Sequence, residues 1–179
     1  MTSLASVTTR GVAVGLIAGI PQVVLTQVEA AFFDVPRERA DIGPRFVRRV
    51  AQRFTGATPS SPTEWLLATL FHFGYAAQWG TLYALAQAWR PTPPLVGGSM
   101  LAGLIYALAF SPWGAATQTG TERHPARRDV RETILHATAA LSFSLTTAYL
   151  YEWLRRRREV PTPQPPPPQA GEGERAATS

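Results

Sequence analysis

The side chains that could carry chemistry within the long apolar stretches of this sequence are Glu29, His72, Glu132 and His136. Carboxylates and imidazoles can bind a divalent metal or pass protons, because His titrates near neutral pH and a neighbouring carboxylate shifts its pKa. An ionisable group inside a membrane segment is costly and is therefore a candidate for function. The alternative is that these groups only hydrogen-bond neighbouring helices and fasten helix ends.

Other kinds of active site are excluded by residues and motifs that the sequence lacks. It has no Cys, which excludes disulfides, Cys-ligated zinc and thiol chemistry. It also has no Walker sequence, no Gly-x-Ser-x-Gly, no His-Glu-x-x-His and no dinucleotide-binding fingerprint. We therefore assign no catalytic residue and no cofactor, and whether the Glu and His residues hold a metal stays open.

Four stretches of the chain are long and apolar enough to cross a bilayer. A hydrocarbon core of roughly 30 Å requires about 20 residues of helix. The four stretches are residues 11–33, 65–89, 95–116 and 133–154. Tryptophans lie near their ends, where indole rings favour the lipid headgroup level. The sequence therefore predicts an all-α fold, an integral membrane four-helix bundle.

The bundle is expected to occupy one domain, residues 10–158, between an N-terminal tail at 1–9 and a Pro-rich tail at 159–179. The composition of the second tail cannot build a core and predicts disorder.

Within the longest connection, Phe46, Val50 and Phe54 share one helical face and arginines fill the rest. This pattern predicts a short amphipathic helix on the membrane surface or, equally, a soluble loop helix that caps the bundle.

The first apolar segment repeats Gly11, Gly15 and Gly19 on one helical face. Small residues at this spacing let helix backbones approach closely, either within the bundle or between two copies of the chain. We therefore expect this face to pack against a helix and to offer a possible homo-oligomer contact. A cleaved signal peptide is the alternative for this segment, because Arg10 precedes it and small residues flank Glu29.

An even number of spans places both termini on one side of the membrane. The end of the first segment, the start of the second and the start of the fourth then share the opposite side, which predicts one polar cluster of Glu29, His72, Glu132 and His136. The short, Pro-rich connection at 90–94 predicts that the second and third helices are antiparallel neighbours. The positions of the arginines do not distinguish clearly between termini inside the cell and termini outside it. We favour termini inside because Arg155 to Arg158 directly follow the last segment.

All 17 basic residues are Arg, and the pI is near 10.4. The arginines lie at the ends of the apolar segments instead of forming a separate basic module. Their guanidinium groups suit headgroup phosphates. The lipid bilayer is therefore the expected partner, and nucleic acid is not.

Several short motifs between Arg10 and Arg158 resemble the YagU-like family of small bacterial inner-membrane proteins. They are Val35-Pro36-Arg37 after a small-residue helix, Leu70-Phe71-His72-Phe73, Gly80-Thr81-Leu82-Tyr83, and Glu132 with His136 ahead of Glu152-Trp153. The resemblance implies a multi-pass location in the bacterial inner membrane and this helix order. It implies no reaction.

Taken together, these patterns predict a multi-pass membrane protein with a structural or interaction role in the bacterial inner membrane. The alternative is a small proton or ion conductor that uses the Glu and His cluster. An enzyme ranks behind both.

Overall fold

Runs rich in Ala and Leu make up most of the long helices of the structure, a computed structural model that describes residues 3–159. Within these residues the chain is helical and has no strand, which confirms the all-α prediction. The long helices are α1 (Leu4–Phe32), α4 (Ser61–Trp89), α5 (Pro94–Phe110) and α7 (Val130–Glu159). The short ones are α2 (Arg37–Ala40), α3 (Ile42–Thr55), α6 (Ala115–Gln118) and a 3-10 turn at Pro125–Arg127.

The helix ends differ from the predicted limits for local reasons. Helix α1 begins at Leu4, within the predicted N-terminal tail, because the Ser3 hydroxyl caps it by accepting a hydrogen bond from the Ser6 N–H. Helix α5 ends at Phe110, since Ser111 takes an extended backbone ahead of Pro112. Glu159 still belongs to α7, and the rest of the tail predicted to be disordered, residues 160–179, lies outside the described residues.

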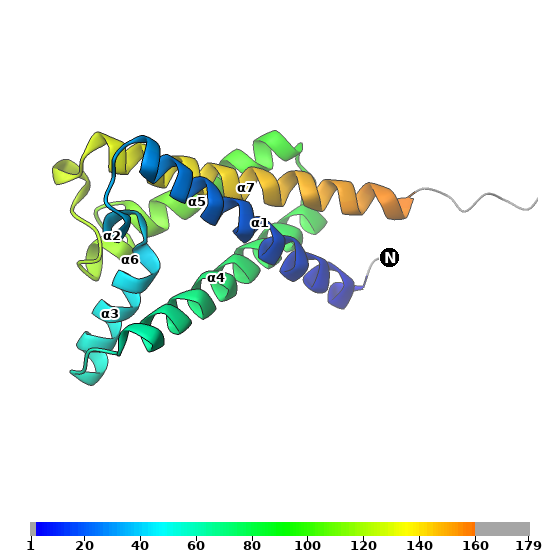
Figure 1. Cartoon of the computed structure of the whole chain (residues 1–179). Helices are drawn as coiled ribbons and strands as arrows, with labels where there is room; N and C mark the ends of the chain where they lie inside the picture. Colours follow the sequence, from blue (N-terminus) through cyan, green and yellow to red (C-terminus); the bar gives the residue numbers. More distant parts are fainter. Residues whose placement is uncertain (1–2, 160–179) are drawn as a thin grey trace, which may run out of the picture.

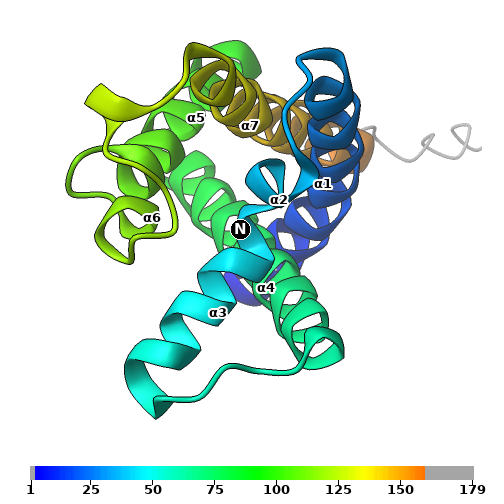
Figure 2. The same cartoon turned by 60° about the vertical axis from the view of Figure 1, so that its left-hand side comes forward.

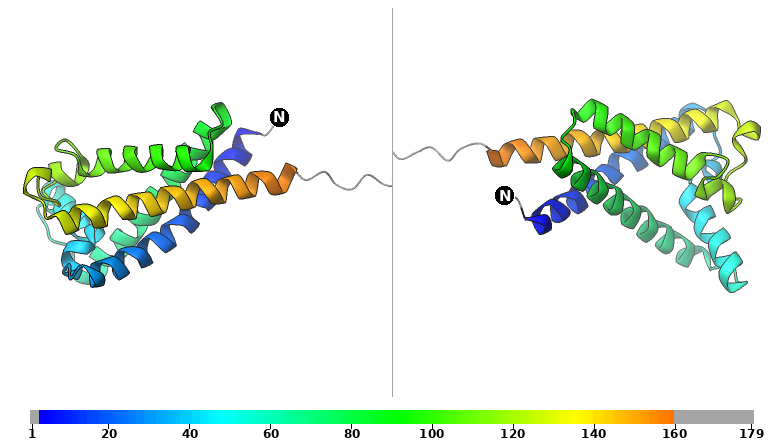
Figure 3. Two further views of the ribbon diagram at one scale, coloured as in Figure 1. Left: turned by 90° about the horizontal axis from the view of Figure 1, so that it is seen from above. Right: turned by 180° about the vertical axis from the view of Figure 1, so that it is seen from behind.

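The long helices run up and down, so that the start of α1 and the end of α7 lie at one end of the molecule (Figures 1 and 3). At this terminal end the Arg10 guanidinium lies 5.8 Å from the centre of the Tyr151 ring. At the opposite end, the Thr138 hydroxyl of α7 donates to Glu29 of α1 over 2.6 Å. We call this opposite end, residues 33–60 and 111–132, the loop end.

Helix α1 crosses α4 at a point where both lack side chains. A Cβ atom on Gly11 would lie 2.6 Å from the Cα of Thr81, and one on Gly80 would lie 2.6 Å from the Cα of Gly15. Neither position can therefore hold a side chain without moving a backbone. The glycine face predicted from the sequence packs against α4 of the same chain and is buried there. The contact between two copies through this face stays a prediction.

The short connection does not make α4 and α5 close neighbours along their length, contrary to expectation. The two helices diverge from it, and α5 packs along α7 while α4 packs along α1 (Figure 1). Gly98 of α5 explains the choice, because a Cβ there would lie 3.2 Å from the Cβ of Ala148 in α7. The buried aromatic side chains of Trp79 and Tyr83 belong to the same core cluster as Leu101 of α5.

By length and composition, two helical stretches among residues 3–159 are apolar enough to cross a membrane, Leu4–Phe32 and Pro94–Gln118. The first is helix α1 and the second joins α5 to α6. Helices α4 and α7, which the sequence also predicts to span, do not meet this criterion. Two helices of this length and composition are consistent with an association with a membrane.

The contact between α1 and α4 generates a stability prediction. Replacing Gly15 by Leu should destabilise the protein by about 1–3 kcal/mol or more, because the added side chain meets the backbone of α4 at Ala76 and Ala77. Thermal unfolding in detergent measures the loss. Gly103→Leu is the matched control, since Gly103 is an exposed helical glycine with no atom near its added Cβ. Equal melting temperatures for the two variants would contradict the close packing.

Candidate functional site

The two predicted cluster residues on α1 and α4, Glu29 and His72, have separate partners. Glu29 of α1 accepts its hydrogen bond from Thr138 of α7. His72 of α4 has its Nε2 atom 3.3 Å from the carbonyl oxygen of Gly19. Each contact joins two helices, as expected of polar groups that fasten a bundle.

The other two, on α7, also have their own surroundings. Glu132 forms an ion pair with Arg39 at 3.2 Å. His136 is buried and stacks on Phe110 with ring centres 4.6 Å apart, and neither ring nitrogen has a hydrogen-bond partner. Among residues 3–159, no hydrogen bond or ion pair joins two cluster residues, and no group of three His, Asp or Glu side chains is placed to hold a metal. The coupled cluster stays a prediction.

A small cavity of about 40 Å³ lies inside the bundle beside His72. Gln22, Tyr75, Ile105 and Phe143 also line it, so all four long helices contribute. A space of this size is enough for one water molecule, which needs polar partners such as Gln22 and His72.

A much larger cavity, of about 550 Å³, lies at the loop end and was not predicted from the sequence. We call it the arginine pocket. Its lining residues come from α2, α3, the segment after α6 and the start of α7: Arg39, Arg45, Arg48, Arg49, Gln52, Gly120, Thr121, Glu122, Arg123 and Glu132. Figure 2 shows these segments gathered at one end of the molecule.

Helix α3 is held in place by contacts with α4. Gly43 lies against Ala68, where an added Cβ would be 3.4 Å from the alanine Cβ, and Phe46 stacks on Phe71 with ring centres 4.8 Å apart. These contacts favour the capping helix over a helix lying free on the membrane surface. Phe46 of the apolar face therefore packs on α4, whereas Phe54 at the end of that face is 81% exposed. Arg45, Arg48 and Arg49 of α3 line the pocket.

An ion pair also fastens α3 to the first turn of α4. Arg48 donates to both carboxylate oxygens of Glu64, over 2.8 and 2.7 Å. The Glu64 side chain is buried, and the hydrogen bonds from Arg48 hold the pKa of this carboxyl below its ordinary value despite the opposing effect of burial. A two-point contact of this kind fixes the plane of the guanidinium group.

A second buried carboxylate, Glu122, lies between two arginines. Arg45 donates to it and also to the backbone oxygens of Thr121 and Arg39. The fully buried Arg128 approaches the other carboxylate oxygen to 3.9 Å and donates to the carbonyl of Phe110. Burial raises the pKa of Glu122, while Arg45 and Arg128 oppose the shift. The carboxylate therefore ties the segment after α6 to α3.

Two arginines of the pocket, Arg49 and Arg123, make no side-chain hydrogen bond or ion pair with the described residues. Both are exposed at the surface. The pocket holds five arginines and two glutamates, so its charge is positive. Guanidinium groups around an open cavity suit an acceptor-only anion, which they can bind with two parallel hydrogen bonds each.

Sequence reasoning missed this site because it treated the loop arginines as topology signals. The available signal was that the predicted four-span topology places the arginines of 37–53 and those of 123–131 on the same side. Glu64 and Glu122 gave no signal of their own, since their role depends on which arginines the fold places beside them.

Comparison with protein-family models, with curated proteins and with solved structures finds no match to this chain. The resemblance to the YagU-like family therefore stays a prediction.

The Glu64 ion pair predicts a pH dependence. Because its folded-state pKa is lowered, Glu64 contributes stability that is present above its unfolded value of 4.5 and is lost as pH falls through the folded value. Arg48→Gln removes this contribution and strands a buried carboxylate. The difference in melting temperature between parent and variant should shrink as the pH is lowered below 4.5. A difference that stays constant with pH would contradict the pairing.

The separate partners of the cluster residues predict independence. In a double-mutant cycle, Glu29→Gln and His136→Ala should change the melting temperature additively, within about 0.5 kcal/mol in free energy. Clear coupling between the two substitutions would instead support one polar network, which the conduction hypothesis requires.

Proposed function

We propose that this chain is a multi-pass helical membrane protein with a structural or interaction role. In this proposal all four long helices cross the bilayer and both termini lie on one side. The bacterial inner membrane is the location that the resemblance to the YagU-like family implies.

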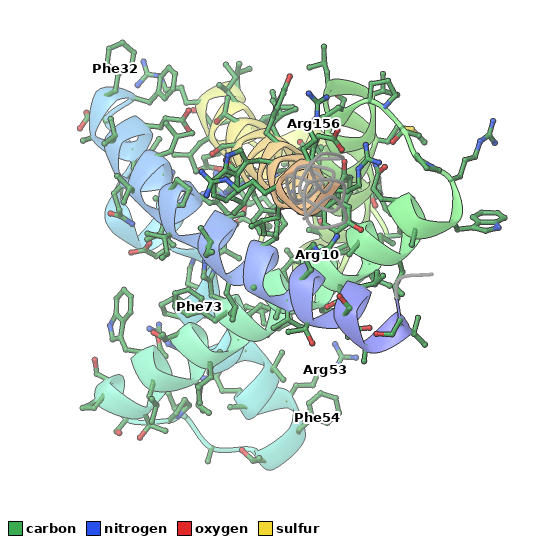
Figure 4. The ribbon with its side chains drawn as sticks, turned by 90° about the vertical axis from the view of Figure 1, so that its right-hand side faces the viewer. Arg10, Phe32, Arg53, Phe54, Phe73 and Arg156 are labelled. Carbon is green, nitrogen blue, oxygen red and sulfur yellow. The ribbon has the colours of Figure 1, made fainter. Side chains whose placement is uncertain are left out.

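The observation that carries the proposal is the outward direction of the large apolar side chains. Soluble proteins rarely expose wide apolar surfaces, since these aggregate or bind partners. Here every long helix exposes several large apolar residues, and Phe32, at 82% exposure, points away from the bundle at the end of α1 (Figure 4). Examples from the four helices are Ile20, Val24, Leu66, Leu70, Met100, Leu104, Leu141 and Tyr149.

The interior is built from small and polar side chains instead. Ala18, Ala84 and Ala148 are fully buried, together with Ser144 and Thr147. Without a hydrophobic force between helices in lipid, close packing of small residues and interhelical polar contacts hold a bundle together. This arrangement suits lipid as the surrounding solvent.

The mean hydropathy of α4 and α7 does not reveal their apolar outer surface. Polar residues lower this mean, yet His136, Ser144 and Thr147 of α7 are buried. In α4 the hydroxyl groups of Thr69 and Thr81 donate to the carbonyl oxygens of the preceding turn. The buried side chains of α7 have no hydrogen-bond partner among residues 3–159, so it is their position inside the bundle that keeps them from lipid. The hydroxyls of α4 are satisfied within their own helix.

Single cysteines introduced into this Cys-free chain test the topology. Ser3→Cys and Ser179→Cys should react alike with a membrane-impermeant maleimide added to intact cells, and Ala57→Cys, in the exposed loop after α3, should react oppositely. The reason is that an even number of spans separates the loop end from both termini. Equal labelling of all three sites, or recovery of the chain in the soluble fraction, would overturn the proposal.

A further inference from the structure

We propose that the arginine pocket binds the phosphate group of an anionic ligand, and that this ligand is the headgroup of a membrane lipid. The choice of a lipid rests on the proposed membrane location. The phosphate chemistry rests on the pocket itself.

Arg49 and Arg123 supply the charge for binding. They come from two segments separated in sequence, α3 and the loop after α6, and both line the pocket. Neither has a side-chain partner among the described residues. A phosphate can therefore bind both without breaking an existing ion pair, and each guanidinium can donate two hydrogen bonds to it.

The remaining arginines of the pocket are already oriented. Arg39 is paired with Glu132, Arg45 with Glu122 and Arg48 with Glu64. In addition, the Nε atom of Arg45 is buried without a hydrogen-bond partner. Fixed donors reduce the side-chain ordering that binding requires. The glutamates thus fix these guanidinium groups around the cavity, which keeps a net positive charge for an anion.

The size of the cavity indicates more than a bare phosphate. At about 550 Å³ it falls within the range of roughly 300–1,000 Å³ that is usual for small-molecule sites. Gln52 and Thr121 add polar side chains to the lining. These groups can hydrogen-bond the glycerol hydroxyls of a headgroup such as that of phosphatidylglycerol.

The position of the pocket matches the headgroup level of the proposed bilayer. Glu64, which orients Arg48 of the pocket, directly precedes Trp65, and Trp113 lies at the same end of the molecule. Both tryptophans are more than half exposed, at 53% and 61%. Indole rings favour the interface between hydrocarbon and water. A lipid phosphate at that depth is within reach of the pocket.

The test is lipid binding to the purified full chain in detergent, followed by native mass spectrometry. Phosphatidylglycerol and phosphatidylcholine are titrated in parallel, with pyrophosphate as the soluble phosphate probe. Phosphatidylglycerol should bind in preference to phosphatidylcholine. Arg49→Gln and Arg123→Gln should each weaken this binding by about tenfold, the effect of losing a charge-assisted hydrogen bond.

Arg53→Gln is the matched control, because Arg53 lies one turn beyond Arg49 on α3 and does not line the pocket. It should bind like the parent. None of these three arginines has a side-chain partner among residues 3–159, so unchanged melting temperatures verify folding.

Binding of pyrophosphate with no preference for phosphatidylglycerol would support the phosphate site and overturn its lipid source. Equal weakening by Arg49→Gln and Arg53→Gln, or no binding of either phosphate compound, would overturn the site. Because cysteine labelling tests the membrane topology separately, failure of the pocket and failure of the topology are distinguishable.

Discussion

The close backbone contact between α1 and α4 is the constraint on which the rest of the fold depends. It exists because Gly11, Gly15 and Gly80 carry no side chains at the crossing. Helix α1 also packs on α7, which in turn packs on α5, so α1 joins the two halves of the bundle. The segments that follow α1 are then carried over the start of α4. Without the crossing, Arg39 would not meet Glu132, nor Arg45 meet Glu122.

The two kinds of surface in this protein follow from different forces. Along the helices, small and hydroxyl-bearing residues such as Ala148 and Ser144 face inward, and large apolar side chains face outward. The loop end has a smaller core than the long helices, and the buried residues of its cluster are Ala30, Ala40 and Leu135. Ion pairs between its segments add to this apolar packing. The glutamates of these pairs are buried, so each needs an arginine to offset the loss of water around its charge.

The sequence was sufficient to predict the helices but not every partner of each helix. Apolar runs indicated the four long helices, and the Gly11, Gly15, Gly19 spacing indicated a packing face. The prediction that the helices on either side of residues 90–94 pack together was wrong. A short connection keeps only the joined ends of two helices close and does not determine how the rest of each helix packs. Proximity of Glu29 and His136 was inferred from membrane depth alone. Depth leaves the rotation of each helix free, and the rotation found here gives these residues different partners, Thr138 and Phe110.

The arginine pocket needed the fold because its chemistry depends on pairing rather than on composition. Each of three glutamates in or beside it pairs with at least one arginine, and these pairs offset part of the local charge while fixing the guanidinium groups. A carboxylate in the pocket would repel an anion if it were unpaired. Glu122 avoids this because Arg45 and Arg128 approach it from different segments. The glutamates therefore determine the shape of the cavity, and Arg49 and Arg123 determine its charge.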